Sequence, residues 1–195
     1  MNSGRLEAFS DGVLAVIITI MVLELHVPDG TDWAALQDAG VGFLTYLLSF
    51  VYVGIYWNNH HHMFQVCGHV NGAVLWANLH LLFWISLFPF TTAWLDESDV
   101  ARVPTLVYGI DLMLAAVAYF LLQQAIFRAP SGHRLREALG GDWKGKLSPF
   151  LYLVGLGLAF VEPWLGLVPF VVVALIWLVP DRRVERYLTG RADPE

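Results

Sequence analysis

The stretch from Arg5 to Leu25, RLEAFSDGVLAVIITIMVLEL, decides how the rest of the chain is interpreted. Its last 17 residues are apolar apart from four polar side chains: Ser10, Asp11, Thr19 and Glu24. An apolar run of about 17–25 residues is long enough for a helix to cross a lipid bilayer. A secretory signal peptide has a similar run, but Asp11 interrupts this one and Glu24-Leu25-His26 is a poor cleavage site. The stretch therefore predicts a retained first transmembrane helix.

The composition of the whole chain agrees with a membrane protein. Of 195 residues, 57% are hydrophobic and 14% are charged, whereas an average soluble domain has about 25% charged residues. This excludes an ordinary soluble enzyme and a disordered chain. The net charge of −6 argues against a nucleic-acid partner. A single cysteine, Cys67, excludes an internal disulfide framework and a cysteine-based zinc site.

The apolar runs predict an all-α, polytopic membrane protein, because they lack the strict alternation of a membrane β-barrel. We expect six transmembrane helices, at residues 9–25, 42–57, 73–95, 105–127, 147–162 and 165–180. The last two come from one apolar block, which Pro163 and Gly166 can fold into a hairpin. A single tilted helix across that block, giving five spans, is the alternative.

The cationic residues indicate the orientation. With the N-terminus inside, ten of the 11 Lys and Arg residues lie on the inner side and only Arg102 lies outside. Because cytoplasmic loops carry an excess of Lys and Arg, both termini are predicted to be cytoplasmic. The predicted outer loops are acidic: Asp29, Asp32, Asp38, Asp96, Glu97, Asp99 and Glu162.

Polar side chains in three predicted helices lie at one depth, near the cytoplasmic side. Asp11 belongs to the first helix, the run Asn58–His62 follows the second, and Asn78 and His80 begin the third. Arg5 is six positions before Asp11, about 240° around the helix, and therefore does not share its face. Asp11 is thus expected to bond to His, Asn or Trp donors of a neighbouring helix. The simpler alternative is that the histidines form a solvated loop and Asp11 only interacts with the helix dipole.

Two further polar features are not interpreted as a metal site or a proton relay. Three consecutive histidines, His60–His62, do not share a helix face, whereas a zinc site needs spaced ligands of fixed geometry. No metal site and no cofactor are therefore predicted. Asp111, near the outer end of the fourth span, is interpreted as a vestibule or helix-pairing residue in preference to a proton relay.

The motif R-x-x-x-F-S-D at Arg5–Asp11, followed by the apolar run to Leu25, resembles the signature first helix of the transmembrane protein 175 family. This family comprises endosomal and lysosomal potassium channels and their prokaryotic homologues. The resemblance continues through Trp57, His60–His62, Leu75–Leu79 and Pro89-Phe90, and covers essentially all six spans.

The resemblance implies a channel architecture. Prokaryotic members carry one six-helix repeat and form homotetramers, so residues 1–195 are expected to be one such channel domain in a prokaryotic plasma membrane. The first helix of each subunit lines the pore, and the signature residues hold that helix against its neighbours. The expected structural network comprises Arg5, Phe9, Ser10, Asp11, Trp57, His60, His61, Asn78 and His80. The implied partners are other copies of the chain and the bilayer, and the implied permeant ions are K⁺, Rb⁺ and Cs⁺.

No T-V-G-Y-G filter loop occurs, so a channel built from this chain must select ions with side chains. Gly12, Val16, Thr19 and Leu23 follow one helical stripe, and the resemblance places the pore on the last three. Apolar rings can gate by dewetting, and a Thr hydroxyl can replace part of an ion's hydration shell. The face of Ala15, Ile18 and Val22 is equally apolar. The predicted pore-lining residues are Gly12, Val16, Thr19, Ile20 and Leu23.

We therefore expect a potassium-selective channel of leak type, without a voltage-sensing Arg-rich helix. The alternative is a proton-coupled transporter that uses Asp11, Asp111 and the histidines as relays, although paired broken helices are missing from the sequence. An enzyme is not expected, because G-x-S-x-G, H-E-x-x-H and a pair of membrane aspartates at matched depth do not occur.

Overall fold

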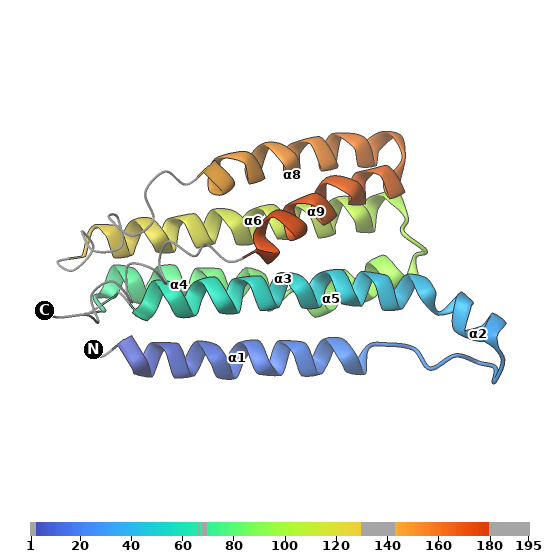
Figure 1. Ribbon diagram of the computed structural model, residues 1–195, viewed down its shortest axis with the longest axis horizontal. Coiled ribbons are helices and arrows are strands. Elements are labelled where there is room, and N and C mark those ends of the chain that lie inside the picture. Colours follow the sequence, from blue (N-terminus) through green and yellow to red (C-terminus); the bar gives the residue numbers. More distant parts are fainter. Residues whose placement is uncertain (1–2, 66, 68–69, 130–142, 180–195) are drawn as a thin grey trace, which may run out of the picture.

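The described apolar segments run alternately in opposite directions, side by side, along the long axis of the computed structural model (Figure 1). The structure describes residues 3–65, 67, 70–129 and 143–179. The helices in these ranges are α1 Ser3–Leu23, α2 Trp33–Asp38, α3 Gly40–Gln65, α4 Gly72–Ile85, α5 Phe88–Glu97, α6 Arg102–Phe127, α8 Trp143–Val161 and α9 Pro163–Leu178. The described ranges contain no strand, so the all-α prediction is confirmed.

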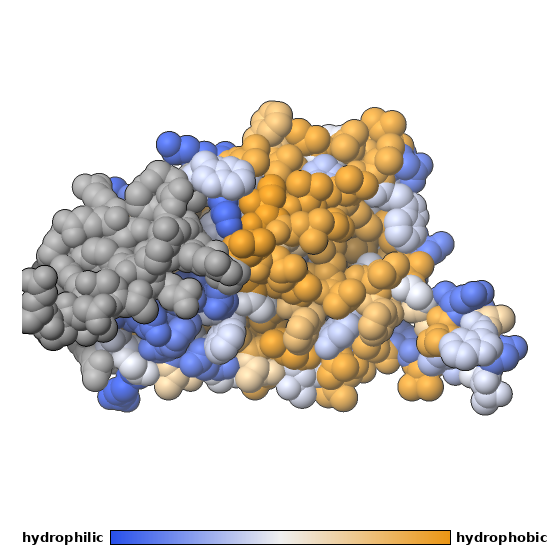
Figure 2. Space-filling model, viewed as in Figure 1, coloured by the Kyte–Doolittle hydropathy of each residue, from blue (hydrophilic) through white to orange (hydrophobic). Residues whose placement is uncertain are grey.

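Five segments are long and apolar enough to cross a membrane, with α4 and α5 together forming one of them. The sixth, α9, is a shorter apolar helix of 16 residues. Apolar residues cover the middle of the face shown in Figure 2, and hydrophilic residues gather toward its two ends. Large apolar side chains such as Phe150, Phe160 and Leu175 are exposed. This distribution is typical of a protein whose middle is surrounded by lipid.

The second and third spans differ from their predicted bounds. Residues 42–57 were expected to be helical, but α3 continues to Gln65 and includes all three histidines, so the solvated-loop interpretation of these histidines is wrong. The third span breaks at Ser86 and Leu87. Pro89 explains the break, because a proline has no amide N–H and clashes with the carbonyl four residues earlier, here that of Ile85.

The last apolar block forms two antiparallel helices, so the five-span alternative is wrong (Figure 1). The chain turns at Glu162, whose backbone is extended, and Pro163 begins α9. Proline is well suited to the first helical position because its fixed φ matches a helix and its missing N–H would be unbonded there. The last predicted residue of this span and the cationic residues at 134, 136, 182, 183, 186 and 191 lie outside the described ranges.

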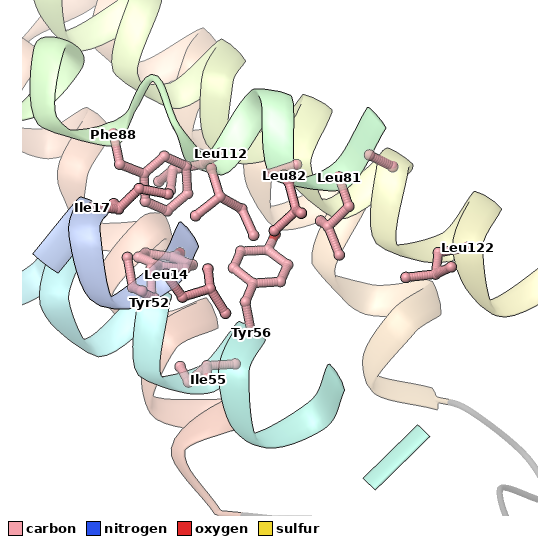
Figure 3. Packing of buried hydrophobic residues seen from close by; sticks show 14 of the residues in the cluster. Leu14, Ile17, Tyr52, Ile55, Tyr56, Leu81, Leu82, Phe88, Leu112 and Leu122 are labelled. Carbon is pink, nitrogen blue, oxygen red and sulfur yellow. The ribbon is translucent and has the colours of Figure 1, made fainter. Parts of the chain in front are cut away.

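The main core lies between α1, α3, α4, α5 and α6 (Figure 3). Leu14 and Ile17 of α1 share this core with Tyr52 and Tyr56 of α3, and Phe88 of α5 stands edge-on to both tyrosine rings. The same core receives Leu81, Leu82, Leu112 and Leu122. Because α1 contributes only one face to this core, its other face is free within the subunit.

A second packing unit joins α8 and α9 to α6. The ring of Phe170 from α9 lies between Gly109 of α6 and Gly155 of α8, where an added Cβ would come within 2.3 Å and 2.4 Å of ring carbons. A Cβ added at Gly166 would similarly come within 2.6 Å of the Cβ of Ala159. Small residues let helix backbones approach closely in a membrane, where van der Waals packing drives helix association.

This packing makes a prediction about two glycines of α8. Gly155→Ala should destabilise the protein by roughly 1–3 kcal/mol, because the new methyl group overlaps the Phe170 ring. Gly157→Ala on the same helix meets nothing within 4 Å and should be neutral or stabilising by up to about 1 kcal/mol. Thermal unfolding of the two variants in detergent measures the difference. Equal midpoints would contradict the proposed fit of Phe170.

Candidate functional site

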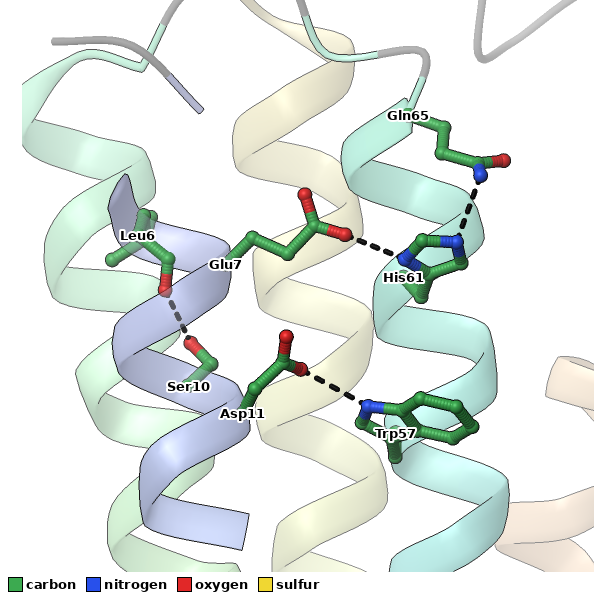
Figure 4. Close-up of polar contacts among 7 residues, drawn as sticks. All are labelled: Leu6, Glu7, Ser10, Asp11, Trp57, His61 and Gln65. Carbon is green, nitrogen blue, oxygen red and sulfur yellow. Dashed lines mark hydrogen bonds and ion pairs between the residues drawn. The ribbon is translucent and has the colours of Figure 1, made fainter. Parts of the chain in front are cut away.

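A group of polar side chains ties the first turns of α1 to the last turns of α3 (Figure 4). The indole Nε1–H of Trp57 donates to Oδ1 of Asp11 at 3.0 Å. One turn away, Nδ1 of His61 lies 2.5 Å from Oε1 of Glu7. Asp11 therefore takes its partner from a neighbouring helix, as the spacing of the sequence led us to expect.

The hydrogen-bond partners of His61 determine which of its ring nitrogens carries the proton. Its Nε2 lies 2.8 Å from the amide nitrogen of Gln65, which can only donate. Nε2 must then accept, so Nδ1 carries the proton and donates to Glu7. The Trp57 ring stacks on His61 with an interplanar angle of 18°. The four side chains thus form a continuous strip along the contact between α1 and α3.

A second, fully buried chain of hydrogen bonds joins α1, α4 and α3. Nδ2 of Asn78 donates to Oγ of Ser10 at 3.0 Å, and Ser10 in turn donates to the backbone carbonyl of Leu6 at 2.9 Å. Nε2 of His60 lies 2.8 Å from Oδ1 of Asn78 and must be its donor. Ser10 and Asn78 are completely inaccessible to solvent. Asn78 therefore holds three helices together from a single side chain.

We call these two sets of bonds together the polar clamp; its members are Glu7, Ser10, Asp11, Trp57, His60, His61, Gln65 and Asn78. Three residues expected in the network lie outside it. Arg5 and Phe9 are exposed on α1 and take no part in these bonds. His80 is also exposed and accepts a hydrogen bond from Trp84 of its own helix at 2.9 Å.

Sequence reasoning missed Glu7 and Gln65 as members of the polar clamp. The spacing of Glu7 and Asp11, four residues apart, places both carboxylates on one helix face and could have pointed to Glu7. Gln65 carries no comparable signal, because the second helix was expected to end before it.

The predicted pore stripe of α1 is exposed within the subunit. Gly12, Val16, Thr19 and Leu23 lie about 200° around the helix from the buried stripe that contains Ser10, Leu14 and Ile17. Val16 is 57% exposed and Leu23 is 76% exposed, and Ile20 is exposed beside them. On the alternative face, Ala15 and Val22 are exposed and Ile18 is half-buried. The burial pattern of one subunit therefore does not decide which of the two faces of α1 would line a pore.

Thr19 is arranged to offer oxygen outward. Its Oγ1 donates to the backbone carbonyl of Ala15 at 2.9 Å, so the hydroxyl hydrogen points back along the helix. The lone pairs of Oγ1 then remain free on the exposed side. Such an oxygen can accept from water or coordinate a cation.

Asp111 is buried between α5 and α6, where its Oδ2 accepts a hydrogen bond from Thr91 Oγ1 at 3.1 Å. Nearby, Ser49 of α3 contacts Thr92 Oγ1 at 2.6 Å and the Tyr108 hydroxyl at 3.0 Å. These bonds link α3, α5 and α6, in agreement with a helix-pairing role for Asp111. Within the described part of the chain, no three His, Cys, Asp or Glu side chains gather closely enough to hold a metal ion.

The polar clamp predicts a specific cost at Asn78. In Asn78→Leu, the buried His60 loses its partner for Nε2, which should cost about 1–3 kcal/mol of stability. The matched control is Asn58→Leu, on a half-buried position of α3 outside the polar clamp, and should cost less than half as much. Thermal unfolding in detergent compares them. A loss at Asn78 no larger than that at Asn58 would refute the central position of Asn78.

Comparison with known proteins identifies the family. The family model described as endosomal/lysosomal potassium channel TMEM175 matches residues 5–89. A potassium channel of Chryseobacterium sp. (strain P1-3) is 52% identical over 96% of this chain and 98% of its own length. A potassium channel of Streptomyces collinus is 33% identical over 90% of this chain and 91% of its own.

A solved structure agrees with these matches. The crystal structure of a lysosomal potassium-selective channel TMEM175 homolog from Chamaesiphon minutus superposes with a TM-score of 0.75 and 31% identity, covering 90% of this chain and 95% of that one. The helical arrangement described above is therefore the TMEM175 channel fold, and the chain is a multi-pass membrane protein that belongs to the TMEM175 family.

Proposed function

We propose that the chain forms a potassium-selective channel of leak type, with α1 of each subunit lining a central pore. The observation that carries this proposal is the two-sided character of α1. The polar clamp and the apolar core hold one face of the helix, and the opposite face presents an uncharged, exposed stripe with the Thr19 oxygen in its middle. The relatives named as potassium channels support the permeant ion, and their family consists of ion channels and not of enzymes.

A pore lined by α1 needs several copies of the chain. In Figure 1, α1 lies at one edge of the bundle, and its partners α3, α4 and α5 are all on one side. An edge helix can meet its copies around a symmetry axis, and soluble and membrane oligomers generally close by such symmetry. A homotetramer in the plasma membrane of a prokaryote is the assembly that we propose, in accordance with the sequence resemblance.

Selection then depends on rings of side chains along the stripe. With a rise of about 1.5 Å per residue, the Thr19 ring lies about 4.5 Å from the Val16 ring and about 6 Å from the Leu23 ring. A ring of hydroxyl oxygens can replace part of the hydration shell of K⁺, Rb⁺ or Cs⁺ between two apolar constrictions. The apolar rings of Val16 and Leu23 can close the pore by dewetting.

The charges at the two ends of the bundle support an orientation with cytoplasmic termini. Arg5, Arg128 and Lys144 belong to one end, and the connections α1–α3, α5–α6 and α8–α9 meet at the other (Figure 1). These connections carry the acidic residues of the predicted outer loops. An acidic outer surface raises the local concentration of cations near the pore entrance.

A proton-coupled transporter is the weaker candidate, because the groups it would use are occupied in helix contacts. Asp11 is bonded to Trp57, and Asp111 is buried against Thr91. Asp11 belongs to the start of α1 and Asp111 to the first half of α6, which begins at the opposite end of the bundle. No chain of bonded side chains connects them within the described residues.

Flux through liposomes tests the proposed function. The wild-type protein should pass K⁺ and Rb⁺ and discriminate against Na⁺, and Thr19→Val should lower the K⁺/Na⁺ ratio about tenfold, since it removes the ring oxygen while keeping the side-chain shape. Thr31→Val changes an exposed connection residue and should leave the ratio unchanged. Absence of K⁺ flux in wild-type liposomes would contradict the proposed function. An unaltered K⁺/Na⁺ ratio in Thr19→Val would show that Thr19 does not take part in selection.

Cysteine accessibility decides which face of α1 lines the pore. Thr19→Cys and Ile18→Cys place a thiol at adjacent positions about 100° apart. A membrane-impermeant methanethiosulfonate should block flux through Thr19→Cys within minutes and leave Ile18→Cys at least tenfold less affected. The native Cys67 is buried and serves as an internal control in the unmodified protein. The reverse order of reactivity would assign the pore to the face of Ala15, Ile18 and Val22.

A further inference from the structure

A cavity of about 270 Å³ lies on the side of α3 that is not occupied by α1. It is enclosed by α3, α6, α8 and α9, far from the predicted pore stripe. The residues that matter for its chemistry are Tyr56, Val117, Phe120, Gln123, Pro149 and Trp177. A space of about 10–15 Å³ is enough for one water molecule, so this cavity has room for a much larger occupant.

The lengths of the helices explain why the cavity exists. α3 and α6 each have 26 residues, whereas α9 has 16 and reaches this region only with its last turn, at Trp177. The facing part of α8 carries the small residues Gly145 and Ser148. The indole of Trp177 donates to Ser148 Oγ at 2.8 Å, and this bond joins α8 to α9 at that depth. The cavity therefore follows from the shortness of α9 and from the small residues that α8 carries there.

Two buried polar side chains in the wall lack partners. Tyr56 is 7% exposed and Gln123 is 5% exposed, and neither side chain makes a hydrogen bond to another residue in the described ranges. Their polar atoms are not among the fully buried atoms without a partner in the described chain, so they reach accessible space in the wall that they line. Other polar groups in the wall are satisfied: the Tyr52 hydroxyl donates to the Phe170 carbonyl at 2.7 Å, and Ser148 donates to the Lys144 carbonyl at 2.8 Å. The cavity therefore offers a free hydroxyl and a free carboxamide.

The rim of the cavity is apolar and lies in membrane-spanning helices. Val117 and Phe120 of α6 are 41% and 52% exposed, and Pro149 of α8 is exposed opposite them. No Asp, Glu, Lys or Arg is among the residues of the described chain that line the cavity. The exposed part of the rim is therefore apolar, and a charged head would have no counter-charge among these residues.

We propose that this cavity binds an uncharged membrane amphiphile, with its hydroxyl or carbonyl head hydrogen-bonded to Tyr56 and Gln123 and its apolar chain extending past Val117 and Phe120 toward the lipid. Tyr56 can donate or accept, and the Gln123 amide can do both at once, so together they satisfy a hydroxyl group completely. The site does not involve the pore stripe, and this assignment is independent of the proposed ion conduction.

Photolabelling tests the proposal on the full-length protein in phosphatidylcholine nanodiscs. The probe is 1-decanol with a diazirine in its chain, and the labelled residues are mapped by mass spectrometry. Labelling should saturate, should concentrate on residues that line the cavity, and should be competed by unmodified 1-decanol. Decanoate, which is charged, should compete at least tenfold less well.

Two pairs of variants separate the site from the general lipid-facing surface. Ala116→Phe fills the cavity and should abolish saturable labelling, whereas Ala73→Phe adds the same volume at an exposed position of α4 and should not. Gln123→Leu keeps the side-chain size and should raise the concentration for half-maximal competition about tenfold. Asn58→Leu, on the half-buried surface of α3, is its control. Size-exclusion profiles matching wild type show that each variant is folded.

Non-saturating label spread evenly over the lipid-facing helices would overturn the proposal. Equal labelling of Ala116→Phe and wild type would also overturn it. An unchanged concentration of 1-decanol for half-maximal competition in Gln123→Leu would show that the hydrogen-bonding head is not recognised. The assignment of an amphiphile would then fail. None of these outcomes bears on ion flux, so they do not decide the proposed channel function.

Discussion

A buried polar group in a lipid-embedded helix must find its hydrogen-bond partner inside the protein, because the surrounding hydrocarbon offers none. Ser10 meets this constraint through Asn78, and Asn78 meets it through Ser10 and His60. The three helices cannot rotate or slide past one another without leaving one of these groups unbonded. The orientation of α1 about its own axis is fixed in this way, and with it the direction in which the exposed stripe points.

The rest of α1 follows from that orientation. With Ser10, Leu14 and Ile17 turned inward, Val16 and Thr19 can only face away from the subunit. All charged and amide groups of the polar clamp lie near the start of the helix, so the stripe beyond Asp11 contains no charge. Such a stripe offers no charge that would trap a cation, and in the proposed pore Thr19 would supply an oxygen between apolar rings.

The sequence alone predicted the helices well and the individual bonds unevenly. The number of spans followed from apolar length, and a partner for Asp11 on a neighbouring helix followed from depth and helical spacing. The end of α3 did not follow from apolar length, because Asn58–His62 are polar, although they continue the helix and His60 bonds to Asn78 of α4. The break at Ser86 was missed although Pro89 explains it, and the direction of His80 depends on Trp84, a partner within one helix that depth cannot reveal.

Different interactions hold the two sides of α3. Hydrogen bonds dominate its contact with α1, and close packing dominates on the side of α8 and α9. Toward α1 it presents Trp57 and His61, which form directional hydrogen bonds to Asp11 and Glu7. Toward α8 and α9 it presents Tyr52 and Tyr56, next to helices packed through glycines and beside an open cavity. The side of α3 that faces α1 thus carries directional hydrogen bonds, and the side that lines the cavity is where we propose that a ligand binds.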